Sequence, residues 1–227
     1  MSSNLGHEYE KHIRANLKGI IHPSDKGLVG AAHEPDVIVK YKTKPVVIEL
    51  KYMVSKADFG QIELHYDKKW TLAPSKNEAF RSALLFAGFE IFINKEWGEF
   101  GSPFWFLKKR GEDITTAQLE HDKKTFKDKF WDAPKNVINT YYRNKGVNYL
   151  QIKGMGLYRV GGSPQTINSQ IPLFAPTIQI RARVKRSGDK NGRKYYSFNA
   201  SVEAFKGGLA KSKYDLDKDH SFLLNIK

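Results

Sequence analysis

The sequence predicts a fold of the α+β or mixed α/β class, with helices and strands that do not follow a regular βαβ series. Apolar residues recur every fourth position near the start of the chain, and two short β-rich runs follow them. Beyond Lys145, Gly, Ser and Asn turns separate strand-like runs. The 227 residues suffice for one sizeable domain, or for one domain with a smaller attachment.

The first predicted element is a helix over residues 4–18, because its apolar residues line one stripe. The stripe comprises Leu5, Tyr9, Ile13 and Leu17. On a helical wheel Glu10 lies about 20° from Leu17, at the border of the stripe, whereas Glu8 lies well outside it. Glu10 is therefore the better candidate for an acid that faces the rest of the fold.

The second predicted element is a hairpin over residues 35–51, PDVIVKYKTKPVVIELK, in which two β-rich runs flank a polar connection. If Lys42 and Thr43 form the turn, Asp36 lies directly opposite Glu49. Glu49 and Lys51 share one face, because side chains alternate along a strand. The favoured register brings two carboxylates and an ammonium together, whereas a shift of one residue would separate them.

A second helix is predicted after the hairpin, with Ser55 and Asp58 as capping residues. Its inner face would comprise Phe59, Ile62, Tyr66 and Trp70. The next expected elements are strands over 84–94 and 103–109, a lysine-rich helix over 113–131 with Leu119, Phe126 and Phe130 inside, and a helix over 135–143.

The charge of the chain is unusual, with 38 Lys and Arg against 24 Asp and Glu, a net charge of +14 and a pI near 9.7. Such a balance favours nucleic acid or an anionic membrane surface as partner. No apolar run approaches the ~18 residues of a membrane span, and the absence of cysteine excludes disulfides and thiolate zinc sites. The start, MSSNLGHEYEKH, lacks the apolar core of a secretory signal, so a cytoplasmic location is expected.

The acids and the lysine of the hairpin suit one kind of chemistry. Two adjacent carboxylates repel each other unless a proton or a cation lies between them. Mg²⁺ prefers one or two carboxylates together with water and substrate phosphate, and Mn²⁺ is expected to substitute for it. A lysine beside such a metal can orient a water or meet charge that develops on a phosphate. Hydrolysis of a phosphodiester is therefore the expected reaction.

Pro35-Asp36 followed by Glu49-Leu50-Lys51 on hairpin-forming strands resembles the PD-(D/E)xK nuclease superfamily. The resemblance covers residues 6–66 and implies a restriction-endonuclease-like fold, a mixed central sheet flanked by helices. It also implies that Asp36 and Glu49 bind Mg²⁺ with the main-chain carbonyl of Leu50, and that Lys51 assists the attacking water.

Two flanking features agree with this resemblance. The stretch Gly6-His7-Glu8-Tyr9-Glu10 is similar to the G-x-x-x-E often found in the family, and Gln61 stands where several branches keep a glutamine. Glu10 and Gln61 are therefore expected to support the site. The chain departs from the Q-x-x-x-Y pattern of the recombination nucleases, because His65 and not Tyr66 is the fourth residue after Gln61.

Residues 145–213 carry 13 Lys and Arg against two acids, so +11 of the net charge lies in this segment. Within it, residues 178–205 alternate with period two and predict a ribbon with one apolar and one polar, basic face. A two-stranded ribbon can enter a DNA groove. The expected DNA contacts are Gln179, Arg181, Arg183, Lys185, Arg186, Arg193, Lys194 and Asn199. The alternative is a solvated sheet whose Lys and Arg protect an edge.

Weaker signals lie elsewhere: Lys56 and His65 are candidate phosphate contacts, and the lysines of 123–129 are expected on a solvated helix face or along a DNA backbone.

We therefore expect a Mg²⁺-dependent DNA endonuclease of restriction or nicking type, from a phage or a mobile element. Residues 1–145 would form the nuclease core, and 146–227 a basic β-rich extension packed on it. Double-stranded DNA is the expected partner, no membrane is involved, and the chain would act as a monomer or a homodimer. A junction resolvase or repair nuclease is the alternative among enzymes, and a non-catalytic DNA-binding protein is the alternative outside them.

Overall fold

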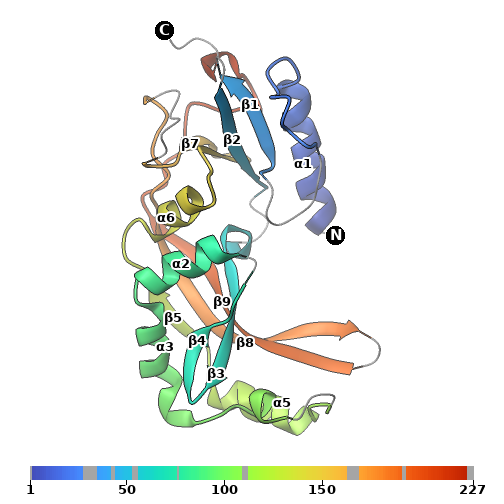
Figure 1. Cartoon of the computed structure of the whole chain (residues 1–227), viewed down its shortest axis with the longest axis vertical. Coiled ribbons are helices and arrows are strands. Elements are labelled where there is room, and N and C mark those ends of the chain that lie inside the picture. The colour runs from blue at the N-terminus through green and yellow to red at the C-terminus, as the bar shows by residue number, and fades with distance from the viewer. Residues whose placement is uncertain are drawn as a thin grey trace.

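The computed structural model describes residues 2–27, 35–41, 44–52, 56–75, 77–108, 112–162, 169–190 and 193–223. The helices are α1 (Ser2–Asn16), η1 (Lys56–Phe59), α2 (Glu78–Phe86), α3 (Phe89–Trp97), η2 (Gly98–Phe100), α4 (Phe104–Leu107), α5 (Thr116–Thr125), α6 (Val137–Asn144) and η3 (Ser221–Leu223), where η marks a 3₁₀-helix. The strands are β1 (Val37–Tyr41), β2 (Lys44–Lys51), β3 (Gln61–Asp67), β4 (Lys69–Leu72), β5 (Lys129–Asp132), β6 (Tyr149–Ile152), β7 (Gly156–Arg159), β8 (Thr177–Lys190) and β9 (Arg193–Gly207). They form two sheets, one above the other in Figure 1.

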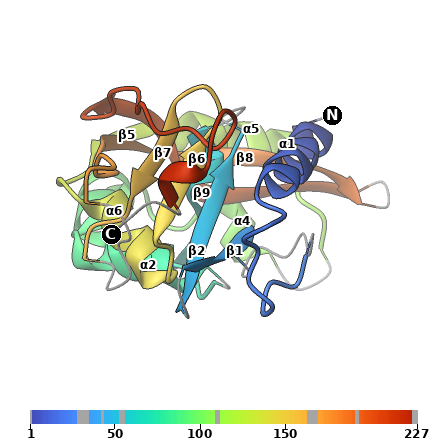
Figure 2. The same cartoon turned by 90° about the horizontal axis from the view of Figure 1, so that it is seen from above.

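The first sheet has the strand order β1-β2-β6-β7, and β2 runs parallel to β6 while the outer pairs are antiparallel. It lies between α1 and α6, as Figure 2 shows from above. The predicted first helix and hairpin are confirmed. Tyr9, Ile13 and Leu17 of the predicted stripe are buried against the hairpin, whereas Leu5 is 48% exposed.

The register of the hairpin is the one that the sequence favours. Val37 pairs with Ile48 and Tyr41 pairs with Lys44, which leaves Asp36 directly opposite Glu49. Residues 42–43, the expected turn, lie outside the described residues. Because β1 and β2 are antiparallel, the beginning of β1 and the end of β2 lie side by side at the same end of the hairpin.

The second sheet has the order β4-β3-β9-β8-β5 and is antiparallel throughout. The predicted alternation of β8 and β9 is confirmed on the apolar side, where Ile178, Ile180, Ala182, Tyr196, Phe198, Ala200 and Val202 are buried. Beyond the ends of β3 and β5, β8 and β9 pair only with each other and project as a ribbon above α5 (Figure 1). The Tyr196 hydroxyl donates to Asp122 Oδ2 of α5 at 2.6 Å, which fixes the apolar face of the ribbon on this helix.

The predicted second helix is wrong, because residues 61–72 form the hairpin of β3 and β4 after the short η1. The spacing of its aromatic residues fits a helix, but Ile62 and Leu64 also alternate with polar neighbours and are buried on one face of a strand. Lys68 adopts a φ of 61° in the tight turn between the strands.

The predicted strands over 84–94 and 103–109 are also wrong. The first segment joins α2 to α3, and Gly88 separates the two helices with a left-handed φ of 86°. The second contains the short α4. The lysine-rich helix predicted over 113–131 ends as α5 at Thr125, and β5 takes the following residues into the second sheet, where Phe130 is 51% exposed. The helix predicted over 135–143 is confirmed as α6.

The expected division at residues 145/146 does not coincide with the two sheets. The first sheet joins β1 and β2 to β6 and β7, and the second joins β3, β4 and β5 to β8 and β9. Each sheet therefore takes strands from both sides of the division. None of the helices in the described ranges is long and apolar enough to cross a membrane.

Gly156 in β7 provides a test of the packing between the first sheet and the C-terminal segment. Its φ is 95°, and a Cβ there would lie 2.5 Å from the carbonyl oxygen of Tyr214. Gly156→Ala should lower the free energy of unfolding by about 1–2 kcal/mol for the left-handed backbone and by about 1–3 kcal/mol more for the clash. Gly154→Ala is the matched control, since Gly154 has a φ of 75° but nothing within 4 Å. Equal losses in urea unfolding would contradict the predicted clash.

Candidate active site

The three motif residues meet at the end of the hairpin where β1 begins and β2 ends. Asp36 Oδ2 accepts a hydrogen bond from the backbone N–H of Leu50 at 2.7 Å. Glu49 lies in the sheet with only 2% of its surface exposed, and Lys51 Nζ donates to its Oε1 at 2.7 Å. The polar side chains that alternation placed on one face of β2 therefore form a compact cluster with the acid opposite them.

Lys145 is a fourth member of this cluster, which the sequence reasoning missed. It follows the last turn of α6, and its Nζ donates to both carboxylate oxygens of Glu49, at 2.8 and 2.7 Å. The signal that could have found it is the spacing of Tyr141 and Lys145, which places both on one face of a helix that continues by one more turn. The connection from β2 through α6 to the parallel β6 brings that face to Glu49.

The two carboxylates have opposite electrostatic environments. Burial and the charge of Glu49 raise the pKa of Asp36 to about 6. Burial alone would raise the pKa of Glu49 too, but the charges of Lys51 and Lys145 outweigh it and hold this pKa below its usual value. Near neutral pH Glu49 is therefore fixed as a carboxylate, and Asp36 is the group of the pair that readily takes a proton or a cation.

Lys51 is held in its charged form. Burial alone would lower its pKa, but Glu49 and Asp36 outweigh burial and raise it above the ordinary lysine value. Tyr141 of α6 is buried beside the cluster, and burial raises the pKa of its phenol, which therefore stays neutral. The cluster thus presents fixed positive charge and a neutral hydroxyl around two acids.

The main-chain carbonyl of Leu50, implied as a ligand by the resemblance, points to the side of β2 on which Asp36 lies. The N–H and C=O of one strand residue point to the same side, and the Leu50 N–H points at Asp36. In the described part of the chain, no group of three or more His, Cys, Asp and Glu side chains is placed to hold a metal. The donors are two carboxylates and one carbonyl, which suits Mg²⁺ that keeps water and phosphate as its other ligands. Oε1 of Glu49 accepts from both lysines and Oε2 only from Lys145, so such an ion would compete with Lys145 for Oε2.

Glu10 lies near this edge but does not belong to the cluster itself. Arg14 Nε donates to Glu10 Oε1 at 3.1 Å, and the same guanidinium donates to the backbone carbonyl of Asp36 and to Asp25. The Glu10 side chain is 15% exposed and that of Glu8 is 59% exposed, so the predicted difference in their orientation on the helix is confirmed. Glu10 is thus placed to position Arg14, and through it the backbone of Asp36.

Gln61 is placed differently from its expected position. It begins β3 rather than a helix, and its Oε1 accepts a hydrogen bond from Lys185 Nζ of β8 at 3.1 Å. His65 is exposed, with its ring 5.2 Å from that of Phe106 in α4. The side chain of Lys56 lies outside the described residues. The structure therefore assigns Gln61 to the second sheet.

The expected DNA contacts on the second sheet and its ribbon fall into four groups. Gln179 and Arg181 are engaged by acids, since Gln179 donates to Asp132 at 2.8 Å and Arg181 to Asp128 at 2.8 Å. Lys185 binds Gln61, as above, while Arg183 and Asn199 each keep an unpartnered buried atom, Nε and Oδ1 respectively, in the described structure. The side chains of Arg186, Arg193 and Lys194 lie outside the described residues.

Two of the four lysines in segment 123–129 are engaged by acids, since Lys123 pairs with Glu120 at 2.9 Å and Lys129 pairs with Glu96 at 2.7 Å.

Comparisons with protein families, with curated proteins and with solved structures found no match to this chain. Its function therefore has to be argued from its own geometry.

The raised pKa of Asp36 predicts a pH dependence of stability. A carboxyl whose pKa is about 6 in the folded protein and about 3.9 in the unfolded chain binds its proton more tightly when folded. Its contribution is fully present below the lower pKa and is lost as pH rises through about 6. Wild type should therefore lose stability relative to Asp36→Asn between pH 4 and 7, measured by urea unfolding in EDTA. A constant difference over that range would contradict the assigned environment.

Proposed function

We propose that this protein is a Mg²⁺-dependent DNA endonuclease of the PD-(D/E)xK type. The observation that carries the proposal is the meeting of Asp36, Glu49 and Lys51 at one sheet edge, in the register that places the two acids directly opposite each other. The restriction-endonuclease-like fold is part of the same proposal. A mixed sheet between α1 and α6, with β2 parallel to β6, is compatible with it.

Asp36, Glu49 and the Leu50 carbonyl would hold Mg²⁺, which when bound supplies a Lewis acid for the phosphate and lowers the pKa of a bound water. Asp36 is suited to this task because an adjacent cation would offset the burial and the charge of Glu49, which together raise its pKa. Glu49 contributes an oxygen after Lys145 Nζ releases one of its two hydrogen bonds.

Lys51 acts in this proposal as a cation and not as a general base. Its raised pKa keeps the ammonium protonated, so it can orient the attacking water and stabilise negative charge on the phosphate. Lys145, once freed from one oxygen of Glu49, offers a second ammonium on the same side of the sheet. The two lysines thus meet charge that develops during hydrolysis.

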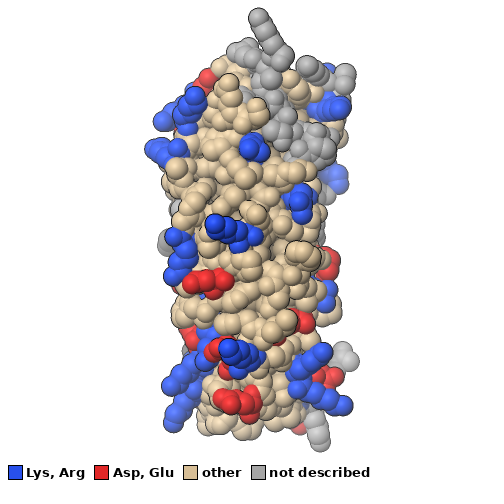
Figure 3. Space-filling view, turned by 90° about the vertical axis from the view of Figure 1, so that its left-hand side faces the viewer, with Lys and Arg blue, Asp and Glu red and all other residues tan. Residues whose placement is uncertain are grey.

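DNA is the proposed substrate because the excess positive charge accompanies the ribbon. The face over α2, α3 and α6 (Figure 3) shows Lys and Arg scattered among Asp and Glu, with much uncharged surface. The ribbon projects on the opposite side of the molecule, toward which the N-terminal end of α1 also points (Figure 1). A duplex bound there would approach the acid cluster and the polar face of the ribbon together.

A non-catalytic DNA-binding protein is the second candidate, and one observation favours it. Glu49 has both oxygens paired with ammonium groups, which is also how a purely structural buried ion cluster is satisfied. A restriction, nicking, resolving or repair role within the nuclease proposal depends on the substrate that is cut.

Cleavage of supercoiled plasmid separates the two candidates. Wild type with Mg²⁺ should nick or linearise the plasmid and should not do so in EDTA. Asp36→Asn, Glu49→Gln and Lys51→Met should each lower the rate by about 100-fold or more, because each removes a ligand or a charge that acts on the phosphate. Duplex binding in EDTA should stay close to wild type. Glu8→Gln, on the exposed side of α1, is the control that should cut normally. Normal cutting by any two of the three site variants would show that the site is wrongly assigned.

Lys145→Met tests whether the cation and this lysine compete for Glu49. Removing the ammonium frees Oε2 of Glu49 and leaves only Lys51 on Oε1, so Mg²⁺ should bind more tightly and raise the melting temperature of the variant by more than that of wild type at equal Mg²⁺. Lys206→Met, at an exposed position of β9, is the matched control. If Mg²⁺ stabilises neither wild type nor Lys145→Met, the cluster is a structural ion pair and the second candidate is the better one.

A further inference from the structure

The polar face of the second sheet contains a buried pair of unsatisfied groups at the base of the ribbon. Arg183 of β8 lies directly opposite Asn199 of β9, and Asn199 is 2% exposed. Arg183 Nε and Asn199 Oδ1 are buried without a hydrogen-bond partner in the described part of the structure. Buried polar atoms are nearly always paired, so two unpaired ones on neighbouring residues require an explanation.

The position of this pair in the sheet indicates what it could meet. β3 pairs with β9 only as far as Glu63 opposite Asn199, and β5 pairs with β8 only as far as Lys129 opposite Ala182. Arg183 and Asn199 therefore lie in the last three-stranded row of the sheet, and the two-stranded ribbon begins at the next pair, Val184 and Phe198. Two-stranded ribbons of this kind fit the major groove of DNA.

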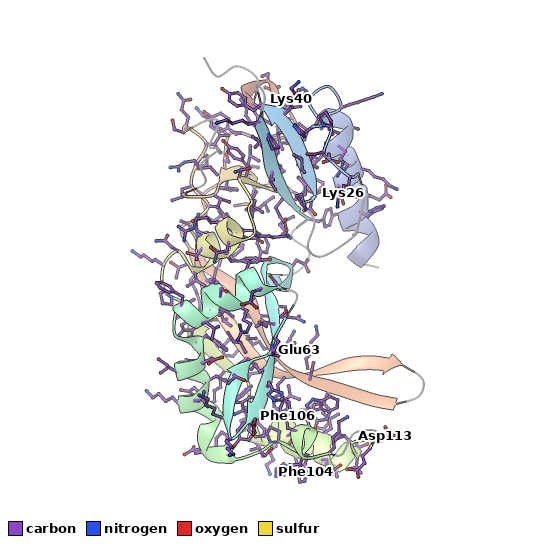
Figure 4. The ribbon with its side chains drawn as sticks, viewed as in Figure 1. Lys26, Lys40, Glu63, Phe104, Phe106 and Asp113 are labelled. Carbon is purple, nitrogen blue, oxygen red and sulfur yellow. The ribbon has the colours of Figure 1, made fainter. Side chains whose placement is uncertain are left out.

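Glu63 extends the pair into a row across three strands, because Glu63, Asn199 and Arg183 are directly opposite one another and share one face. Glu63 is exposed, and Figure 4 shows it where β3 meets the base of the ribbon. At the ordinary strand spacing the row spans roughly 10 Å, within the width of about 12 Å of the major groove. Arg, Asn and Glu are the side chains that pair with guanine, adenine and cytosine edges respectively.

A hydrogen bond now lies over this row. Gln61 is beside Ser201 and Lys185 is beside Ser197, so the bond from Lys185 Nζ to Gln61 Oε1 crosses β9 at Asn199, midway between these serines. Asn199 and both serines are buried on this face, which the sequence predicts to be exposed, and Asn199 Nδ2 donates to Ser197 Oγ at 2.6 Å. The bond from Lys185 to Gln61 joins a lysine to a neutral amide, so a phosphate can draw the ammonium away from it.

We propose that Arg183, Asn199 and Glu63 read base edges in the major groove, and that Lys185 uncovers them when it moves from Gln61 to a DNA phosphate. The protein is then a sequence-selective DNA binder. This inference rests on the proposed function for its substrate class, and it adds that substrate choice depends on the second sheet. Gln179 and Arg181, on the same face, are held by acids and do not read bases.

The test is selection of bound duplexes from a random library in EDTA, where no cutting interferes, followed by titration of the selected duplex and its single-base variants. Wild type should enrich a defined sequence. Glu63→Gln and Asn199→Ser should each lower discrimination at one position of that sequence by about 10- to 100-fold. Arg181→Ala is the matched control, a loss of charge on the same face that should leave the preference unchanged while weakening all duplexes alike.

Glu63→Gln keeps the inference testable if changes at the buried Asn199 disturb folding, because Glu63 is exposed and the change is isosteric. No enriched sequence, or an enriched sequence unchanged in both variants, would overturn the inference. Plasmid cleavage with Mg²⁺ separates this failure from failure of the proposed function. Cutting without sequence preference overturns only the base-reading row, and preference without cutting overturns only the nuclease.

Discussion

The buried carboxylate of Glu49 is the constraint on which the first sheet depends. A charge in the middle of a sheet is expensive unless ammonium or metal neutralises it. Lys51, two residues along the same strand, supplies one partner, and Lys145 supplies the other from the end of α6. Residues 52–144 separate Lys51 from Lys145, so the chain has to come back to the end of β2 with α6 before β6 begins. This path of the chain allows both the parallel pairing of β2 with β6 and the ion pair of Glu49 with Lys145.

The segment between β2 and α6 is not an independent appendage, because the second sheet is completed by β8 and β9 from the C-terminal half of the chain. η1 connects the sheets at the level of the acid cluster, where the Tyr142 hydroxyl of α6 donates to the Phe59 carbonyl at 3.5 Å. Gln61, two residues further along, already belongs to the polar face of the second sheet. A short stretch of chain therefore leads from Lys51 to the surface that we propose for DNA.

The parts of the fold that the sequence predicted are those that local contacts determine. The hairpin register follows from its two-residue connection, and the stripe of α1 from helical periodicity. The prediction of the second helix was wrong because two periods fit the same residues. Phe59, Ile62 and Tyr66 recur at a helical spacing, whereas Ile62 and Leu64 alternate as in a strand. Pairing with β9 stabilises the strand. Lys145 and the Lys185–Gln61 bond could not be predicted, since each joins residues that only the completed topology brings together.

In the proposed nuclease, the two lysines on Glu49 would let one site serve both stability and chemistry. Without a bound metal ion, the charges of the two lysines compensate the buried carboxylate of Glu49 and keep its pKa low, so this end of the sheet is stable in the absence of metal. Asp36, which accepts a backbone N–H but has no ammonium of its own among the hydrogen bonds of the cluster, keeps the raised pKa. A divalent ion between the acids would stabilise the ionised form of Asp36 more than that of Glu49, because the negative charge of Asp36 is less compensated. The same ion would release positive charge from Glu49 toward a bound phosphate. In the proposed nuclease, displacement of Lys145 from Glu49 by Mg²⁺ would convert a stabilising ion pair into a site that can act on an anion.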